Sequence, residues 1–266
     1  MQRYFRKLLV IAFLIAAFIL VPNTVRASGN VTRISGSNRY ETSIKLNNYF
    51  GWANTAIVVN GQNYPDSLSA GSLSAKIGAP IYLSSSLESL NAEFTRLGVT
   101  EVVIVGGVNS VSSDLENGLR QNYNVTRLAG QNRYETSNVV TQYAGLDTVA
   151  VVTGRDYKDA LITANLLKTK NIGLKLSDDV GHLNEFNVKY IVGENALENQ
   201  ANTYRINTGS TEVNAVKIFE TMPRKSNLIV ASNGNFADAL SAGGVLDVMD
   251  AQLMLIDGSY ASEIVL

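Results

Sequence analysis

The segment Val31–Ser43 reads VTRISGSNRYETS, and nearly the same string, VTRLAGQNRYETS, returns at Val125–Ser137. Ten of the thirteen positions are identical in the two strings. Agreement at this level shows that the chain contains copies of one unit, and a repeated unit decides how the rest of the sequence is interpreted.

A second repeated block follows each opening string, and it occurs three times: Ala56–Leu83, Ala150–Leu176 and Leu228–Leu255. A later segment, VVIVGG at Val102–Gly107, returns once as YIVGE at Tyr190–Glu194. The third copy opens weakly at Tyr204 and has no NRYET string. We therefore predict a leader at 1–27 and three repeats at 31–124, 125–203 and 204–266, with the third divergent and truncated.

The NRYET string has the spacing of a helix start. Asn38 stands three residues before Glu41, and Asn132 stands three residues before Glu135, which is the spacing of a capping box. A helix over Arg39–Tyr49 is predicted from this spacing.

The remainder of the unit alternates strands with helices. The predicted strands are apolar throughout, which is typical of a parallel sheet covered on both faces. The predicted fold class is therefore α/β, built from tandem small modules with parallel sheets flanked by helices. In the first copy the expected elements are strands at Thr55–Asn60, Ile81–Ser84 and Val102–Val105, and helices that begin at Pro65 or span Leu90–Leu97 and Val111–Arg120.

The first residues have the three-part pattern of a secretory signal: a basic start, an apolar run over Leu8–Val21, and small residues at Val25 and Ala27. The run is shorter than the roughly 20 residues that span a bilayer. A cleaved signal is favoured, with an uncleaved anchor as the alternative, so we expect an exported chain that does not stay in the membrane.

Charge and composition argue against nucleic-acid binding and indicate how the modules are stabilised. Removing the four basic leader residues from 22 Lys and Arg leaves 18 against 23 Asp and Glu, a formal net charge of −5. General nucleic-acid binding is not expected of such a chain, because it normally needs a basic face. With no cysteine, the modules must be stabilised by buried apolar surface.

Candidates for catalysis are scarce. The single histidine, His182, has no counterpart in the first copy, and zinc hydrolases need several ligands at set spacings. The glycine pairs Gly106-Gly107 and Gly243-Gly244 do not belong to a G-x-G-x-x-G or P-loop motif. We therefore predict a chain that is not an enzyme, with no metal and no cofactor.

Three aspartates recur at predicted helix starts, where a carboxylate satisfies free amides and favours the helix dipole. The alternative is a polar rim at the carboxyl ends of the strands, where α/β sheets usually bind ligands. The three aspartates are Asp66, Asp159 and Asp238. The same structural role at helix starts is assigned to the residues of the capping boxes: Asn38, Glu41, Asn132 and Glu135.

Arg39 and Arg133, each followed by a tyrosine (Tyr40 and Tyr134), are placed poorly for the helix dipole and need another explanation. One explanation is a buried ion pair across an interface between modules. The other is capture of a carboxylate or phosphate on a polymer, with the tyrosine stacked on a sugar ring. The residues alone leave both explanations open.

The two NRYET strings, the segment NGQNYPDSLSAGSLSAKIGAPIYL and the VVIVGG strand resemble the repeats of the cell-wall-binding repeat type 2 family. The resemblance covers the chain from Val31 to Leu266. It implies modules that occur three in tandem on Gram-positive surfaces, arranged about a pseudo-threefold axis. It also implies non-covalent attachment to an anionic secondary polymer of the wall.

The resemblance also carries over a short motif, PILL in the family, that is linked to polymer binding. It falls on Pro80–Leu83, on Gly173–Leu176 and, in the third copy, on Gln252–Leu255. A short core strand explains the same residues equally well. The polymer-binding candidates from this motif are Ile81, Tyr82, Leu83, Leu174, Lys175 and Leu176.

The function expected from the sequence is therefore a secreted wall anchor without catalysis, whose partner is an anionic secondary wall polymer or peptidoglycan. Two other functions stay open. One is an accessory or modifier of a peptidoglycan amidase, and the other is a structural subunit of a surface layer. The polymer bound and the oligomeric state do not follow from the sequence.

Overall fold

The computed structural model describes residues 30–178, 185–194 and 202–257. The predicted leader, His182 and the last residues of the third repeat lie outside the described residues. From Arg33 onward the described chain belongs to one compact unit, which consists of three modules. Within the described residues, no helix is both long and apolar enough to cross a membrane.

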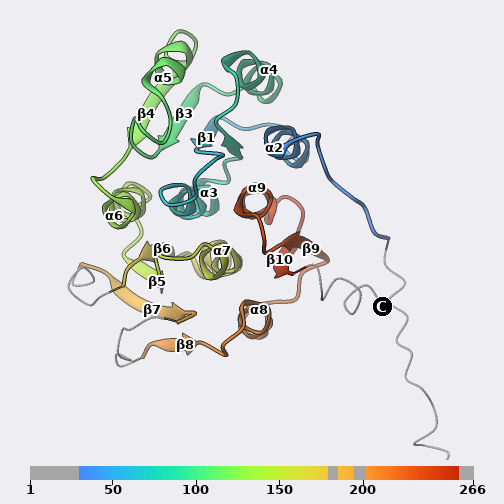
Figure 1. Cartoon of the computed structure of the whole chain (residues 1–266), viewed down its shortest axis with the longest axis vertical. Helices are drawn as coiled ribbons and strands as arrows, with labels where there is room; N and C mark the ends of the chain where they lie inside the picture. Colours follow the sequence, from blue (N-terminus) through green and yellow to red (C-terminus); the bar gives the residue numbers. More distant parts are fainter. Residues whose placement is uncertain (1–29, 179–184, 195–201, 258–266) are drawn as a thin grey trace, which may run out of the picture. The chain divides into compact units, whose positions relative to one another are not determined.

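The first module has the most complete set of elements (Figure 1). Its strands alternate with helices, as the sequence predicts, apart from a 3₁₀ turn, η1, ahead of the second helix. In chain order the elements are α2 (Arg39–Asn47), β1 (Thr55–Val59), η1 (Ser67–Ser69), α3 (Ala70–Ile77), β2 (Ile81–Leu83), α4 (Leu87–Leu97), β3 (Glu101–Val105), α5 (Ser113–Leu119) and β4 (Asn124–Leu128).

The second and third modules repeat this order with fewer described elements. The second contains α6 (Arg133–Tyr143), β5 (Thr148–Val152), α7 (Lys158–Lys170), β6 (Gly173–Leu176), β7 (Asn187–Val192) and β8 (Tyr204–Ile206). The third contains α8 (Thr211–Glu220), β9 (Asn227–Ser232), α9 (Phe236–Val245) and β10 (Ala251–Ile256).

Each module has its own sheet, and every strand pair in the described residues is parallel. The strand orders are β2-β1-β3-β4, β6-β5-β7-β8 and β10-β9. Helices follow the strands as crossover connections, so the predicted α/β class with parallel sheets flanked by helices is confirmed.

The strand that opens one repeat in the sequence pairs with the sheet of the preceding module. β4 contains the VTRL string of the second repeat, yet it pairs with β3, with Val102 opposite Val125. In the same way β8 pairs with β7, with Tyr190 opposite Tyr204. The three units are thus joined by shared sheets as well as by side-chain packing.

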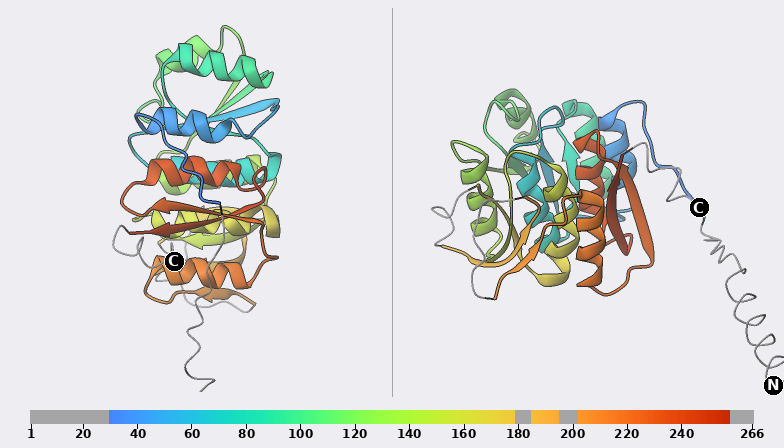
Figure 2. Two further views of the ribbon diagram at one scale, coloured as in Figure 1. Left: turned by 90° about the vertical axis from the view of Figure 1, so that its right-hand side faces the viewer. Right: turned by 60° about the horizontal axis from the view of Figure 1, so that its bottom comes forward.

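The core lies between the sheets and a central group of three helices, α3, α7 and α9, which contact one another. The residues of β1 and β5 that follow the first threonine are fully buried. Figures 1 and 2 show α9 between α2 and α7, so the first helix of the first module packs against the third module. Correspondingly, α6 packs against α3 and α8 packs against α7.

The predicted helix starts and ends agree with the structure at several positions. Asn38 accepts a hydrogen bond from the Glu41 amide and Asn132 accepts one from the Glu135 amide, so both asparagines cap their helices as predicted. The glutamate side chains accept from the amides of Ser37 and Gln131, one residue before the asparagine amides that a capping box uses. α3 ends at Gly78, whose φ of 68° is the left-handed conformation that glycine adopts easily. The predicted start of the second helix at Pro65 was wrong, because η1 precedes α3, which begins at Ala70.

The third sheet has only two strands in the described residues, so one edge of β9 carries no neighbouring strand. Leu228 is 49% exposed and Val230 is 44% exposed. Their counterparts in the first two modules, Ala56, Val58, Val149 and Val151, are completely buried. Within the described residues, the third module therefore has an exposed apolar sheet face that the other two lack.

Candidate functional site

Equivalent aromatic residues from the three modules meet at one point, which we call the aromatic junction: Tyr64, Tyr157 and Phe236. The ring centroids of Tyr64 and Tyr157 lie 5.2 Å apart, and that of Phe236 lies 5.9 Å and 6.0 Å from them. Separations of this size allow favourable edge-to-face contacts. Tyr157 directly precedes α7 and Phe236 begins α9, whereas Tyr64 lies before η1 and α3, so the junction holds together the segments that lead into the three central helices.

Two of the junction residues also hydrogen bond to the next module. The Tyr64 hydroxyl donates to the Arg155 carbonyl at 2.9 Å, and the Tyr157 hydroxyl donates to the Asn233 carbonyl at 2.7 Å. Phe236 has no hydroxyl and cannot make the corresponding bond to the first module. The hydroxyl bond that links the first module to the second, and the second to the third, therefore has no counterpart between Phe236 and the first module.

Both arginines of the NRYET strings lie between modules. Arg39 donates from Nη1 to the Gly61 carbonyl at 2.6 Å, and its guanidinium lies 6.0 Å from the Phe236 ring centre of the third module. Arg133 donates to the Gly154 carbonyl and lies 6.0 Å from the Tyr64 ring centre of the first module. Cation–π contact explains a placement that the helix dipole disfavours.

The recurring aspartates also face a neighbouring module. Asp66 accepts a hydrogen bond from Thr136 at 3.0 Å, and Asp159 accepts one from Asn214 at 3.1 Å. Asp66 makes no hydrogen bond as a helix cap, and the cap of α9 is Asn235 rather than Asp238. The aspartates lie at helix starts as expected, but the carboxylates of Asp66 and Asp159 connect modules.

The third aspartate differs from the other two. Within the described residues, Oδ1 of Asp238 is buried without a hydrogen-bond partner. Burial raises the pKa of Asp238, and the charge of Arg39 opposes that rise. Burial also raises the pKa of Asp159, where the hydrogen bond from Asn214 opposes the rise.

The two predicted tyrosines have different surroundings. Tyr134 donates its hydroxyl to Asp178, whereas Tyr40 packs closely beside Gly61, where a side chain would meet the ring at 2.7 Å. Burial and the bond to Asp178 raise the pKa of Tyr134. Of the two tyrosines, Tyr134 is the one that bonds to a carboxylate within the described residues.

Asp178 is the centre of a polar cluster in the second module. Besides Tyr134, it accepts hydrogen bonds from Thr153 at 2.7 Å, the Gly154 amide at 3.3 Å and Arg155 Nε at 3.3 Å. Burial raises the pKa of Asp178, but these hydrogen bonds outweigh burial and hold it below its ordinary value. The carboxylate is therefore ionised at neutral pH.

The residues of the PILL-type motif form the short strands β2 and β6 and the inner part of β10. All six candidate side chains on β2 and β6 are buried, and Lys175 is fully so. Lys175 Nζ donates to the carbonyls of Leu176 and Tyr134 at 3.1 Å and 3.3 Å. The structure thus places these residues inside the modules: Ile81, Tyr82, Leu83, Leu174, Lys175 and Leu176.

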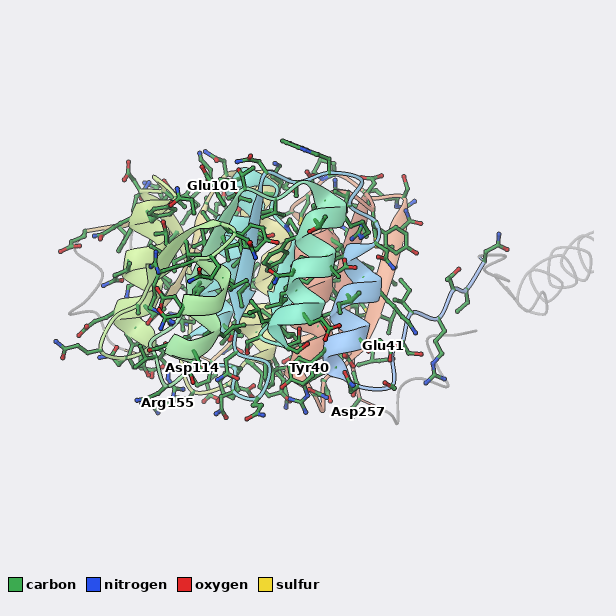
Figure 3. All side chains as sticks on the ribbon, turned by 90° about the horizontal axis from the view of Figure 1, so that it is seen from above. Tyr40, Glu41, Glu101, Asp114, Arg155 and Asp257 are labelled. Carbon is green, nitrogen blue, oxygen red and sulfur yellow. The ribbon has the colours of Figure 1, made fainter. Side chains whose placement is uncertain are left out.

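The carboxyl ends of the strands open on one common face. In Figure 3, Arg155 and Asp257, which follow β5 and β10, lie at the same edge as Tyr40, while Glu101 at the start of β3 lies at the opposite edge. We call this edge the carboxyl-end face. It brings together the strand-end loops of all three modules, which is where parallel sheets usually bind ligands.

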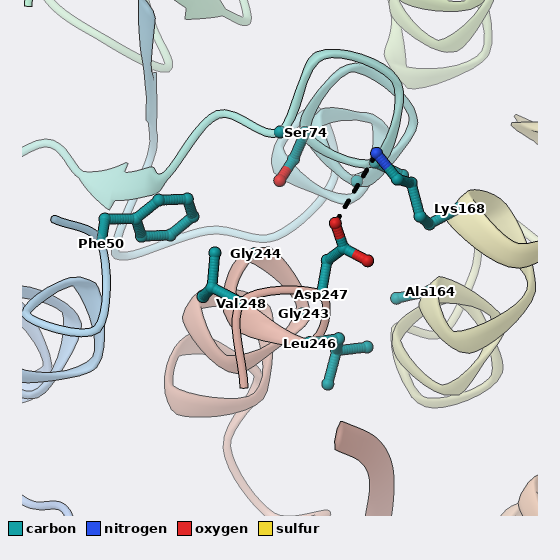
Figure 4. A pocket seen from close by; sticks show the side chains of 12 residues that line it. Phe50, Ser74, Ala164, Lys168, Gly243, Gly244, Leu246, Asp247 and Val248 are labelled. Atoms are coloured by element: carbon teal, nitrogen blue, oxygen red, sulfur yellow. Dashed lines mark ion pairs between the residues drawn. The ribbon is translucent and has the colours of Figure 1, made fainter. Parts of the chain in front are cut away.

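A small cavity lies at the other ends of the central helices (Figure 4). Its volume is about 40 Å³, and Ala164, Gly243 and Gly244 are among the residues that line it. An ion pair of 3.7 Å between Lys168 and Asp247 crosses it. Ligand pockets usually measure several hundred Å³, so this cavity is too small for a sugar polymer.

No group of three or more His, Cys, Asp or Glu residues in the described part of the chain could hold a metal ion. Sequence reasoning missed Arg155 and Asp178. The available signal was the alignment of strand-end loops, in which Arg155 stands where the first copy has Gln62 and Asp178 stands where it has Ser85.

Comparison with solved structures supports the fold. Cwp6 from Clostridium difficile is similar with a TM-score of 0.75 and 22% identity, over 90% of this chain and 45% of that chain. Cwp8 from Clostridium difficile is similar with a TM-score of 0.73 and 22% identity, over 84% of this chain and 44% of that chain. At this identity the likeness establishes the shared fold.

Comparison with curated proteins gives two relatives from Bacillus subtilis (strain 168). The Amidase enhancer is 27% identical over 243 residues, which are 84% of this chain and 34% of that protein. N-acetylmuramoyl-L-alanine amidase LytC is 35% identical over 165 residues, which are 60% of this chain and 33% of that protein. This chain therefore spans about a third of the length of each relative.

The family model "Cell wall binding domain 2 (CWB2)" matches residues 33–116 and 127–204. These segments cover most of the first two modules, and they include both NRYET strings and both aligned strand-end loops. Since together they make up more than half of the sequence, the chain belongs to the cell wall binding domain 2 (CWB2) family.

Proposed function

We propose that this chain is a secreted, non-catalytic wall anchor that attaches non-covalently to an anionic secondary polymer of the cell wall. Family membership supports the coarser part of this statement, since CWB2 domains bind a component of the cell wall and are located at the cell surface. The finer part concerns the polymer and the residues that bind it.

The observation that carries the proposal is the carboxyl-end face. The arginines of both NRYET strings begin helices on this side, and within the described residues each guanidinium donates one hydrogen bond to a backbone carbonyl. A guanidinium has five N–H donors, so donors are left on Arg39 and Arg133 for an oxyanion. Tyr40 and Tyr134 follow them and supply rings for sugar stacking.

We also propose that the modules are arranged about a pseudo-threefold axis through the aromatic junction. The supporting contacts are cyclic: α6 packs on the first module, α8 on the second and α2 on the third. Such an arrangement would hold several weak sites on one rigid body, so a repetitive polymer would be bound by avidity. The net charge of the mature chain is negative, so the anions must be met by local arginines.

The buried PILL-type strands would act indirectly in this scheme. Their side chains shape the sheets from which the strand-end loops project, and Lys175 fixes the Tyr134 carbonyl at the start of α6. Polymer contact would then come from the loops around these strands rather than from the strands themselves.

A second function is favoured by one comparison. The relative named Amidase enhancer covers most of this chain, so an accessory role toward a peptidoglycan amidase is the alternative. An anchor needs only the wall, whereas an enhancer must also change the rate of an amidase.

The experiment is co-sedimentation of the purified protein with Gram-positive cell walls, before and after acid removal of phosphate-linked polymers. We expect binding that is lost on stripping. Retained binding would point to peptidoglycan, and an absence of binding to intact walls would contradict the anchor function. Addition of the protein to an amidase assay on the same walls tests the accessory role.

A further inference from the structure

The second module carries a charged pair on the carboxyl-end face that the other modules lack. Arg155 is 81% exposed in its side chain, and its Nε donates to Asp178 at 3.3 Å. The aligned positions are Gln62 and Ser85 in the first module. In the third module, Gly234 stands in the place of the arginine.

The loop that bears Arg155 is fixed from several sides. The Gly154 carbonyl accepts from Arg133, and the Gly154 amide donates to Asp178. The Arg155 carbonyl accepts from Tyr64 of the first module, and its amide donates to Thr153 at 3.1 Å. The backbone of this loop is therefore held by both modules before any ligand arrives.

The side chain of Arg155 is oriented as well. Asp178 is ionised and already accepts from Tyr134, Thr153 and Gly154, so it offers Nε of Arg155 one remaining direction of approach. Among the described residues, no protein acceptor meets Nη1 or Nη2 of Arg155. The two terminal nitrogens form a planar fork of the kind that binds phosphate or carboxylate with two hydrogen bonds.

A second cation lies next to this fork. Arg133 donates to the carbonyl of Gly154, the residue directly before Arg155, and both guanidinium groups act electrostatically on the Tyr134 hydroxyl. Two arginines at one strand end can balance more than one negative charge of a polymer.

We propose that Arg155, positioned by Asp178 and assisted by Arg133, is the oxyanion-binding residue of the wall polymer site, at the junction of the first and second modules. The inference rests on the proposed function and assigns its ligand chemistry: phosphate or carboxylate groups along a sugar-containing chain. It also makes the second module the main binding module.

The test compares Arg155→Gln with Arg224→Gln as a matched control. Arg224 is also exposed and lies before β9, toward the opposite ends of the strands. Both variants lose one positive charge. In co-sedimentation with Gram-positive walls, Arg155→Gln should bind roughly ten- to a hundredfold more weakly, the range expected for lost hydrogen bonds to a charged group. Arg224→Gln should bind like the parent protein.

A second measurement separates this inference from the proposed function. Calorimetric titration with inorganic polyphosphate and with polygalacturonate tests the fork without cell walls and distinguishes phosphate from carboxylate. Wall binding that is equal in Arg155→Gln and the parent would overturn the inference and leave the anchor function standing. If the parent does not bind walls, binding of either polyanion that depends on Arg155 supports the fork. Binding that does not depend on Arg155, or no binding, overturns it.

Discussion

Strands β1 and β9 occupy the same place in the first and third modules, yet their surroundings differ. β1 lies between β2 and β3 and is fully buried after its first residue, whereas β9 has β10 on one side and no strand on the other within the described residues. The side chains of Val58 and Val230 are the same, and only Val230 is exposed. Burial in this fold is therefore decided by neighbouring elements and not by the strand's own sequence.

The open edge has no protective feature. The sequence of β9, NLIVAS, contains no charge and no proline, the residues that usually keep edge strands from pairing with other chains. The amide of Asn227 donates to the carbonyl of Asp250, directly before β10, and the amide of Asn233 donates to the carbonyl of Ile256 at the end of β10. Because backbone groups alternate along a parallel strand, those of Leu228 and Val230 face the open edge.

The largest expected difference comes from placing a charge on each strand. Val58→Asp would bury an unpaired carboxylate and should destabilise the protein by more than about 4 kcal/mol or prevent folding. Val230→Asp should change the free energy of unfolding by less than about 1 kcal/mol, since the new carboxylate reaches water. Urea denaturation measures both. Equal losses for the two variants would show that β9 is covered in solution.

Sequence reasoning could predict the parallel α/β modules because apolar strands, capping boxes and terminal glycines are local signals. It could not show that β4 pairs with the preceding sheet, since the string VTRL carries no information about its partner. For the same reason Asp66 looked like a helix cap: the position at a helix start is local, but the acceptance of a hydrogen bond from Thr136 is tertiary. The Arg155–Asp178 pair joins two distant loops and was not visible.

A smaller difference is expected between the aspartates. Asp66→Ala would leave the hydroxyl of the buried Thr136 without its acceptor and should cost about 1–3 kcal/mol. Asp238→Ala removes a carboxylate whose Oδ1 has no partner in the described structure, so the cost should be near zero or the change stabilising.

The pH dependence sharpens this second comparison. The folded-state pKa of Asp238 is raised, so its contribution to stability is full below the unfolded pKa, about 4, and is lost as the pH rises through the folded value. The free energy of unfolding of Asp238→Ala, taken relative to that of the parent protein, should therefore be higher at pH 7 than near pH 4. Urea denaturation at the two pH values measures it, and a difference of the opposite sign would contradict the assigned burial.

The smallest expected effect concerns the aromatic junction, where only the third module lacks a hydroxyl. Tyr64→Phe removes the bond to the Arg155 carbonyl and should cost about 0.5–1.5 kcal/mol. Phe236→Tyr adds a hydroxyl toward the strand-end loop of the first module and should gain a similar or smaller amount if a carbonyl of residues 60–63 accepts it. Thermal denaturation of both variants is the measurement.

A loss of stability in Phe236→Tyr would mean that the third module is held against the first at a different distance, since a hydroxyl without an acceptor at the junction is costly. The cyclic pattern of contacts would then hold for two of the three interfaces, and the divergence of the third module would extend from its sheet edge to the centre of the fold.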